Sequence, residues 1–232
     1  LTTTIVDGTV ATYSWTGPDG FTANIANPSI PFVTRDANGT YELIVSSAEG
    51  CLDTATVDVT IYIRPEITVA SNGPICEGES LNLTTTIVDG TVATYSWTGP
   101  NGFTANTQNP SIPFVTRNAD GTYQLIVSSA EGCLDTATVD VTIYIRPEIS
   151  VASNGPICEG ATLNLTTNII DGTVATYSWT GPNGFTANTQ NPSIPFVTRN
   201  ADGTYQLIVS SAEGCLDTAT VDVTIYIRPE IS

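Results

Sequence analysis

Residues 121–143 read GTYQLIVSSAEGCLDTATVDVTI, and this stretch decides the fold. Apolar residues occupy every second position from 123 to 127 and again from 137 to 143, and the turn Ala130–Cys133 lies between the two segments. An apolar residue at every second position is typical of a β-strand that buries one face. The stretch therefore predicts two strands joined by a tight turn.

The same stretch recurs along the chain. Nearly identical segments begin at Leu1, Leu83 and Leu165, so the repeat is 82 residues long and the 232 residues hold just under three copies. Units of solenoids and propellers have only ~20 to ~50 residues, whereas a unit of this length can close a small core of its own. We predict tandem domains at residues 1–64 (lacking the first strand), 65–146 and 147–228, with 229–232 beginning a further copy.

Shorter alternating segments in the second copy predict more strands, near 67–69, 81–87 and 93–97. The segment 103–117 contains two prolines, which cannot donate to a strand ladder, so we expect an edge strand or irregular structure there. No segment has a period of 3.6 residues. Short strands separated by frequent turns predict an all-β fold, a tandem array of β-sandwiches.

Composition excludes several functions. The chain has 23 acidic and 6 basic residues, a net charge of −17, and no His. All six basic residues are arginines. Without His and Lys, the chain cannot form a Ser-His-Asp or Cys-His centre, a His-containing metal site or a Schiff base. The acidic balance disfavours nucleic acid, and no apolar run approaches the ~20 residues of a membrane span. We expect no enzyme, no nucleic-acid partner and no membrane insertion of this segment.

Trp97 and the segment Asp120–Tyr123 resemble the strand-C tryptophan and the tyrosine corner of an immunoglobulin-type sandwich. The wider segment 121–139 is similar to the PKD-type and immunoglobulin-like repeats of giant Bacteroidetes surface proteins exported by type IX secretion. The resemblance covers every copy and implies an extracellular, cell-surface location. Leu125 stands where antibody domains have a cysteine, so their usual disulfide is absent. The expected core aromatic residues are Trp15, Trp97, Trp179, Tyr41, Tyr123 and Tyr205.

The five cysteines occupy two turns of this fold, which implies oxidation in a secreted protein. In the second copy, we letter the predicted strands A (67–69), B (81–87), C (93–97), F (123–127) and G (137–143). Cys76 and Cys158 lie in the turn between strands A and B, while Cys51, Cys133 and Cys215 lie in the turn between strands F and G. These turns lie at opposite ends of a sandwich, about 26 Å apart for an eight-residue strand, whereas a disulfide needs Cα atoms within about 7 Å. We favour the bond Cys76–Cys215 between neighbouring copies, with Cys51, Cys133 and Cys158 paired outside this segment. Pairing within a copy, such as Cys76–Cys133, and free or interchain cysteines stay open.

Three weaker candidates accompany the cysteines. Asp36, Asp120 and Asp202 could supply oxygen ligands for Ca²⁺, although ordinary glycine turns explain them as well. Thr54, Thr136 and Thr218 follow Asp and precede Ala, which resembles the O-glycosylation signal of Bacteroidetes; the alternative is an exposed threonine at the start of a strand. Phe103 is the aromatic residue that we would test for ligand contact. We expect no cofactor.

Near-identical copies indicate that each one performs the same task. We therefore expect that the repetition serves to make the protein long. No Gly or Ser spacer separates the copies, and Pro147 holds Arg146 extended. We therefore predict the structural repeat of an extracellular filament, stalk or giant adhesin, forming a stiff disulfide-stabilised rod. Its partners would be further copies of the repeat, and several chains could form a homo-oligomer or bundle. The alternative is a set of lectin-like or partner-binding modules that act by avidity.

Overall fold

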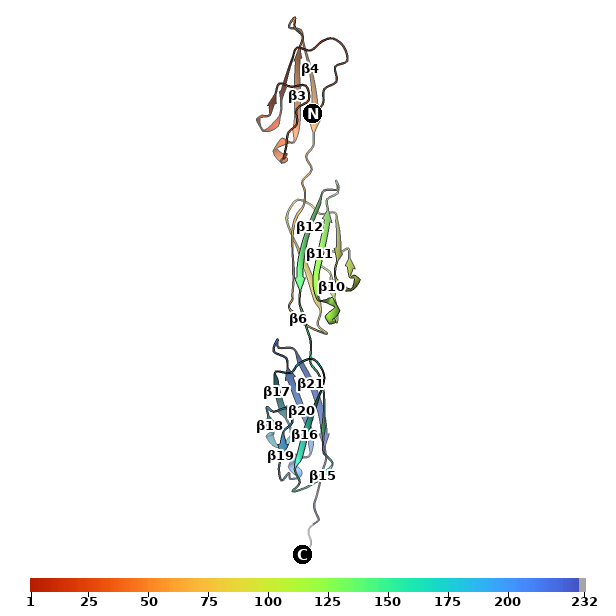
Figure 1. Cartoon of the computed structure of the whole chain (residues 1–232), viewed down its shortest axis with the longest axis vertical. Coiled ribbons are helices and arrows are strands. Elements are labelled where there is room, and N and C mark those ends of the chain that lie inside the picture. The colour runs from red at the N-terminus through yellow and green to blue at the C-terminus, as the bar shows by residue number, and fades with distance from the viewer. Residues whose placement is uncertain (230–232) are drawn as a thin grey trace. The chain divides into compact units, whose positions relative to one another are not determined.

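The computed structural model describes residues 1–229, which form strands, turns and six short 3₁₀ segments without an α-helix (Figure 1). No helix in this range is long and apolar enough to cross a bilayer. The chain has two compact units: Leu1–Ile67 with Ile87–Tyr95 and Ile126–Thr136, and Thr68–Thr86 with Ser96–Leu125 and the chain from Ala137 onward. The domain boundaries at 64/65 and 146/147 stay predictions. Residues 230–232 of the predicted final segment lie outside the described residues.

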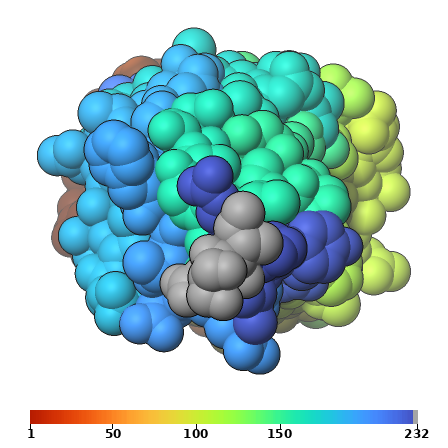
Figure 2. Space-filling view, turned by 90° about the horizontal axis from the view of Figure 1, so that it is seen from below, coloured from red at the N-terminus to blue at the C-terminus, as the bar shows by residue number. Residues whose placement is uncertain are grey.

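The third copy is a complete sandwich. Its strands are β14 (Glu148–Ser153), β15 (Ile157–Cys158), β16 (Leu163–Asp171), β17 (Thr176–Thr180), β18 (Thr186–Ala187), β19 (Ser193–Ile194), β20 (Gly203–Ser210), β21 (Leu216–Val223) and β22 (Ile225–Tyr226). One sheet has the order β14-β16-β19 and the other β18-β17-β20-β21, while β15 and β22 form a parallel pair. This is the arrangement of an immunoglobulin-like domain, in which strands A, B and E (β14, β16 and β19) face strands C, F and G (β17, β20 and β21). Its residues form a closely packed surface in Figure 2.

The core of the third copy comes from the alternating residues of both sheets. Leu163, Trp179, Tyr205 and Leu207 are all fully buried and belong to one apolar cluster. The Tyr205 hydroxyl donates to the carbonyl of Ala201 at 3.0 Å, which is the bond of a tyrosine corner. Burial raises the pKa of this tyrosine.

The second copy has the same sheets, with the orders β10-β7-β5, β12-β11-β8-β9 and β13-β6. Its strands are β5 (Glu66–Ser71), β6 (Ile75–Cys76), β7 (Leu81–Asp89), β8 (Thr94–Thr98), β9 (Thr104–Ala105), β10 (Ser111–Ile112), β11 (Gly121–Ser128), β12 (Leu134–Val141) and β13 (Ile143–Tyr144). Trp97, Tyr123 and Leu125 are completely buried, and the Tyr123 hydroxyl donates to the carbonyl of Ala119 at 2.9 Å. The predicted fold, a tandem array of immunoglobulin-like sandwiches, is confirmed.

The first copy forms only one sheet, with the order β2-β1-β3-β4. Its strands are β1 (Thr12–Thr16), β2 (Thr22–Ala23), β3 (Gly39–Ser46) and β4 (Leu52–Val59). Trp15, Tyr41 and Leu43 make a small core. Residues 1–11 form no strand, whereas the equivalent residues of the third copy lie largely in β16, which pairs with β14.

Candidate functional site at the junction of copies

The turn that carries Cys76 is fixed to the end of its own copy. Strand β6 pairs in parallel with β13, the last strand of the same copy, and aligns Cys76 with Tyr144. The backbone N–H of Glu77 donates to the carbonyl of Tyr144 at 2.9 Å, and the N–H of Cys76 donates to a carboxylate oxygen of Glu79 at 2.9 Å. The cysteine is therefore held where the chain leaves the second copy.

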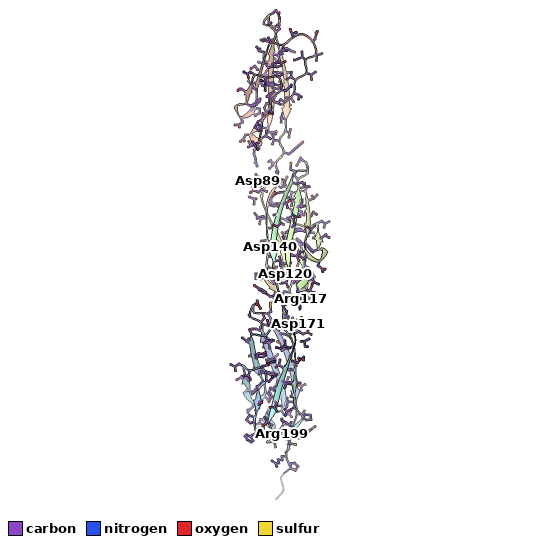
Figure 3. All side chains as sticks on the ribbon, in the orientation of Figure 1. Asp89, Arg117, Asp120, Asp140, Asp171 and Arg199 are labelled. Carbon is purple, nitrogen blue, oxygen red and sulfur yellow. A yellow bond between two sulfur atoms is a disulfide. The ribbon has the colours of Figure 1, made fainter. Side chains whose placement is uncertain are left out.

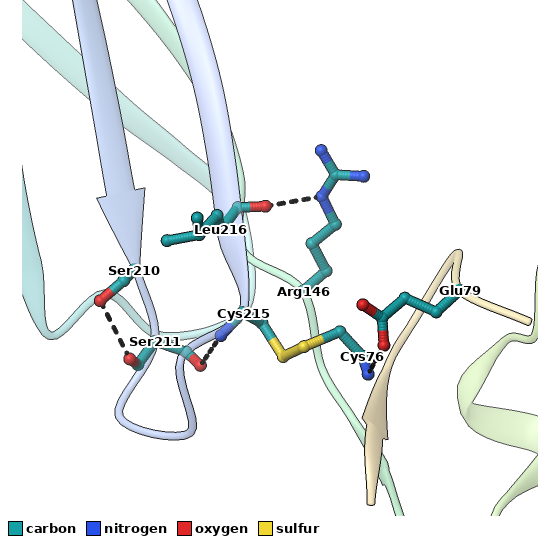
Figure 4. The surroundings of a disulfide bond; sticks show 7 residues. All are labelled: Cys76, Glu79, Arg146, Ser210, Ser211, Cys215 and Leu216. Atoms are coloured by element: carbon teal, nitrogen blue, oxygen red, sulfur yellow. Dashed lines mark hydrogen bonds between the residues drawn. A yellow bond between two sulfur atoms is a disulfide. The ribbon is translucent and has the colours of Figure 1, made fainter. Parts of the chain in front are cut away.

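The turn that carries Cys215 closes on itself. The N–H of Ser211 donates to the carbonyl of Cys215 at 2.9 Å, and the N–H of Cys215 donates to Ser211 Oγ at 3.3 Å. Cys215 is 1% exposed. It forms a disulfide with Cys76 (Figure 4), with the two Cα atoms 5.7 Å apart, inside the range that a disulfide requires.

This bond is the pair that the sequence favoured. It joins the A–B turn of the second copy to the F–G turn of the third, so pairing Cys76 with Cys133, or Cys158 with Cys215, is wrong. Cys51, Cys133 and Cys158 have no disulfide partner within the described residues. Their pairing outside this segment stays a prediction.

An arginine beside the disulfide holds the next copy. Arg146 follows β13, and its Nε donates to the carbonyl of Leu216 at 2.8 Å, while its Nη2 lies 3.3 Å from Asp217 Oδ1. The other carboxylate oxygen of Asp217 accepts the N–H of Ile149, on strand β14, at 3.0 Å. One aspartate thus fixes both the arginine and the first strand of the third copy.

The same contacts recur one repeat earlier. Arg64 donates to the carbonyl of Leu134 at 2.8 Å and to Asp135 at 2.6 Å, and the N–H of Ile67 donates to Asp135 at 3.0 Å. Burial by itself would raise the pKa of Asp135, but the N–H groups of Ile67 and Thr136, together with Arg64, lower it on balance. The carboxylate is therefore held ionised.

A second arginine clamp uses the 3₁₀ segment η4 (Arg117–Ala119) (Figure 3). The Arg117 guanidinium lies 2.5 Å from Asp171 and 3.3 Å from Glu77, and its backbone N–H donates to Glu77 at 2.7 Å. The pKa of Asp171 is lowered by the N–H of Gly172 and by Arg117, and Asp171 and Glu77 raise the pKa of Arg117. Arg35 and Asp89 repeat the pair at 2.6 Å.

Sequence reasoning missed these arginines, although a signal was present. The six arginines occupy only two positions of the repeat, one in residues 35, 117 and 199 and the other in residues 64, 146 and 228. The carboxylates that these arginines contact in the following copy come 54 or 71 residues later. Arginines that recur at two places in a chain with little positive charge indicate a shared role, but only the fold shows their partners.

The candidate calcium ligands and glycosylation sites lie outside these contacts between copies. The carboxylates of Asp120 and Asp202 accept the N–H groups of Ile143 and Ile225 at 2.9 Å, and Asp36 is exposed. Within residues 1–229, no group of three or more His, Cys, Asp or Glu side chains could hold a metal ion. Thr54, Thr136 and Thr218 are exposed on β4, β12 and β21, as glycosylation would require.

Phe103 is half-buried. It packs edge-on against Tyr123, with ring centroids 5.5 Å apart. Ligand contact at this residue stays a prediction. The exposed aromatic of this copy is Phe114, which is 80% exposed.

No protein-family description matches the chain, and no curated protein matches it. Solved structures with a similar fold include murine CEACAM1b, at 15% identity, covering 69% of this chain and 100% of that chain with a TM-score of 0.38. The three N-terminal domains of the bacteriophage RB49 highly immunogenic outer capsid protein are 13% identical and cover 94% of this chain and 88% of that chain, with a TM-score of 0.40. The sheet order within each copy, and not these likenesses, carries the assignment to tandem immunoglobulin-like domains.

Proposed function

We propose that this chain is the structural repeat of an extracellular filament, stalk or giant adhesin, in which disulfides and arginine clamps stiffen the junctions between copies. The observation that carries the proposal is the Cys76–Cys215 bond, because it links the turns of two consecutive copies. A domain that only displayed a binding site would have no need of a covalent bond to its neighbour. The recurring arginine contacts support the same role.

The connection between copies supports limited bending. Pro147 is buried, and Gly172 approaches it so closely that a Cβ at Gly172 would lie 3.1 Å from the proline Cα. Gly172 also has a φ of +73°, which favours glycine. The turn after β16 therefore covers the connecting segment. We propose that tension along the chain is borne by the disulfide in parallel with this covered segment.

An oxidising, extracellular location fits the Cys76–Cys215 disulfide. We include in the proposal a PKD-type kinship, type IX secretion by a Bacteroidetes cell and sugars on Thr54, Thr136 and Thr218. The chain would act without catalysis and without a cofactor. Several chains could associate into a bundle.

Stretching single molecules tests the mechanical part. The disulfide spans a sequence separation of 139 residues, which at about 3.3–3.6 Å each locks away roughly 480 Å of extension. Oxidised chains should release that length only after reduction. The variant Cys76→Ser/Cys215→Ser should release it without reductant, whereas Cys133→Ser should behave as the wild type. Equal extension of the oxidised wild type, the double variant and Cys133→Ser would contradict the proposal that the disulfide bears tension.

Immunogold labelling of source cells tests the biological part, with an antibody against one copy. Gold at regular intervals along fibres supports a filament shaft, and gold scattered over the envelope supports a single-chain adhesin. Absence of surface gold would overturn the proposal. A glycan array with one copy and with three copies tests the alternative, because modules acting by avidity give a signal that grows with copy number.

A further inference from the structure

One phenylalanine in each copy projects into solvent from the loop before a 3₁₀ segment. Phe32, Phe114 and Phe196 are 99%, 80% and 80% exposed. Their φ angles are +52°, +51° and +53°. Exposure is as high in the third copy as in the second, so it does not depend on the copy that follows.

Both features are unfavourable for this residue type. The left-handed region brings the Cβ of an L-residue too close to the backbone, and a bulky side chain there is an outlier. An exposed aromatic ring also gives up the gain from burial. Glycine or asparagine would suit the backbone, yet all three copies have phenylalanine. Such strain points to a role outside the domain.

The loop is anchored on both sides of the ring. Ile112, on β10, pairs with Leu81, and Val115 is 3% exposed. The N–H of Val115 donates to the carbonyl of Glu79 at 2.9 Å, and the N–H of Gly78 donates to the carbonyl of Val115 at 2.8 Å. Phe114 therefore lies in a bulge between two paired segments, and a bulge of this kind re-aims a side chain.

We propose that these phenylalanine loops are the lateral contacts between this chain and a second copy of the same chain. A single ring buries roughly 150–250 Å², far below the ~800 Å² per partner of a stable interface. A partner must therefore engage several loops at once. A second copy of the chain has the same number of loops at the same interval, whatever that interval is. Contacts that are weak singly then add through avidity.

This inference rests on the proposed function, because it assigns residues to the bundling of chains. It concerns contacts between chains and is independent of the Cys76–Cys215 junction. The net charge of −17 makes two chains repel at low salt. An apolar contact between like-charged chains should therefore strengthen as salt screens the repulsion.

Sedimentation velocity of the whole chain over a range of concentrations tests the proposal. The wild type should form dimers or larger species, more so at high salt. The variant Phe32→Asn/Phe114→Asn/Phe196→Asn should need about tenfold or more protein to associate. Asparagine tolerates the left-handed region, so the melting temperature should stay equal or rise, which separates lost association from misfolding.

The matched control is Leu52→Thr/Leu134→Thr/Leu216→Thr, which removes one other exposed apolar side chain from each copy; these leucines are 71%, 56% and 55% exposed. Its association should equal that of the wild type. A wild type that stays monomeric at every concentration and salt would overturn the proposal. So would a phenylalanine variant that associates normally, or a leucine variant that fails equally. None of these outcomes bears on the disulfide or on the stretching experiment.

Discussion

The first and third copies share most of their sequence, but equivalent side chains are less buried in the first copy than in the third. Val33 is 46% exposed in the first copy, whereas its counterpart Val197 is 3% exposed. Strand β4 is exposed over nearly its whole length, whereas β21 alternates between exposed and partly buried residues. The Trp179 indole donates to the carbonyl of Gln190 at 3.4 Å, whereas the buried indole nitrogen of Trp15 has no hydrogen-bond partner among residues 1–229.

The difference comes from one strand. In the third copy, β14 pairs with β16 from Ile149 to Ser153 and completes the second sheet. In the first copy, residues 1–11 form no strand. The C–F–G sheet thus forms from its own residues, whereas the A–B–E sheet and the full core depend on strand A.

Supplying the missing strand should produce the largest effect. Placing residues 65–82 before Leu1 should let residues 1–7 pair as β16 does and should bury Val33. Burial of about three further apolar side chains at ~1.5–3 kcal/mol each stabilises the first copy by about 5 kcal/mol. Hydrogen exchange should slow in residues 1–11. The same extension with aspartates in place of the residues copied from Ile67 and Val69 is the control, and equal exchange in both would refute the explanation.

Truncating the core tryptophan should give the second-largest difference in stability between the first and third copies. Trp179→Ala should destabilise the third copy by about 3–5 kcal/mol, because it empties a closed core. Trp15→Ala should destabilise the first copy less than Trp179→Ala destabilises the third, by a difference of about 1 kcal/mol or more. The reason is that the Trp15 indole already lacks its hydrogen bond. Urea unfolding followed by hydrogen exchange in each copy gives both values. Equal losses would mean that the first copy has a closed core in solution.

Removal of the disulfide should have an intermediate effect. Cys76→Ser/Cys215→Ser should lower the free energy of unfolding by about 2–4 kcal/mol, because the bond restricts the unfolded chain. Cys133→Ser removes a cysteine without a bond in the described residues and should leave stability unchanged. Thermal unfolding with and without reductant measures the difference. A wild type that is insensitive to reductant would contradict it.

Acid should weaken the arginine clamps by a smaller amount. The pKa values of Asp135 and Asp171 are lowered in the folded chain, so their contribution is present above the ordinary carboxyl pKa of about 3.9 and is lost as the pH falls through the folded value. Stability should therefore be steady between about pH 7 and 5 and should fall below about pH 4.

The variant Asp135→Asn isolates one clamp. It should be less stable than the wild type at neutral pH, and the two should converge in acid, where the aspartate is protonated. Thermal melts from neutral to acidic pH measure the convergence. A constant gap at all pH values would show that the ionisation of Asp135 does not contribute to stability.

Local patterns in the sequence were enough to determine the fold class. Alternation through residues 123–127 and 137–143 reflects a single physical rule, burial of every second side chain, and that rule needs no knowledge of distant residues. The 82-residue period and the place of each cysteine in a turn then made Cys76–Cys215 the favoured pair. That inference held because strand length alone separates the two ends of a sandwich.

Only the tertiary structure decided the rest. Arg117 contacts Asp171, and Arg64 contacts Asp135, at sequence separations of 54 and 71 residues. Local alternation of side chains cannot predict partners so far apart in the sequence. Phe103 and Phe114 are both phenylalanines beside turns, yet Phe103 is half-buried against Tyr123 and Phe114 is exposed. The first copy has nearly the sequence of the third but lacks its second sheet, because a strand becomes stable only when another strand satisfies its backbone hydrogen bonds.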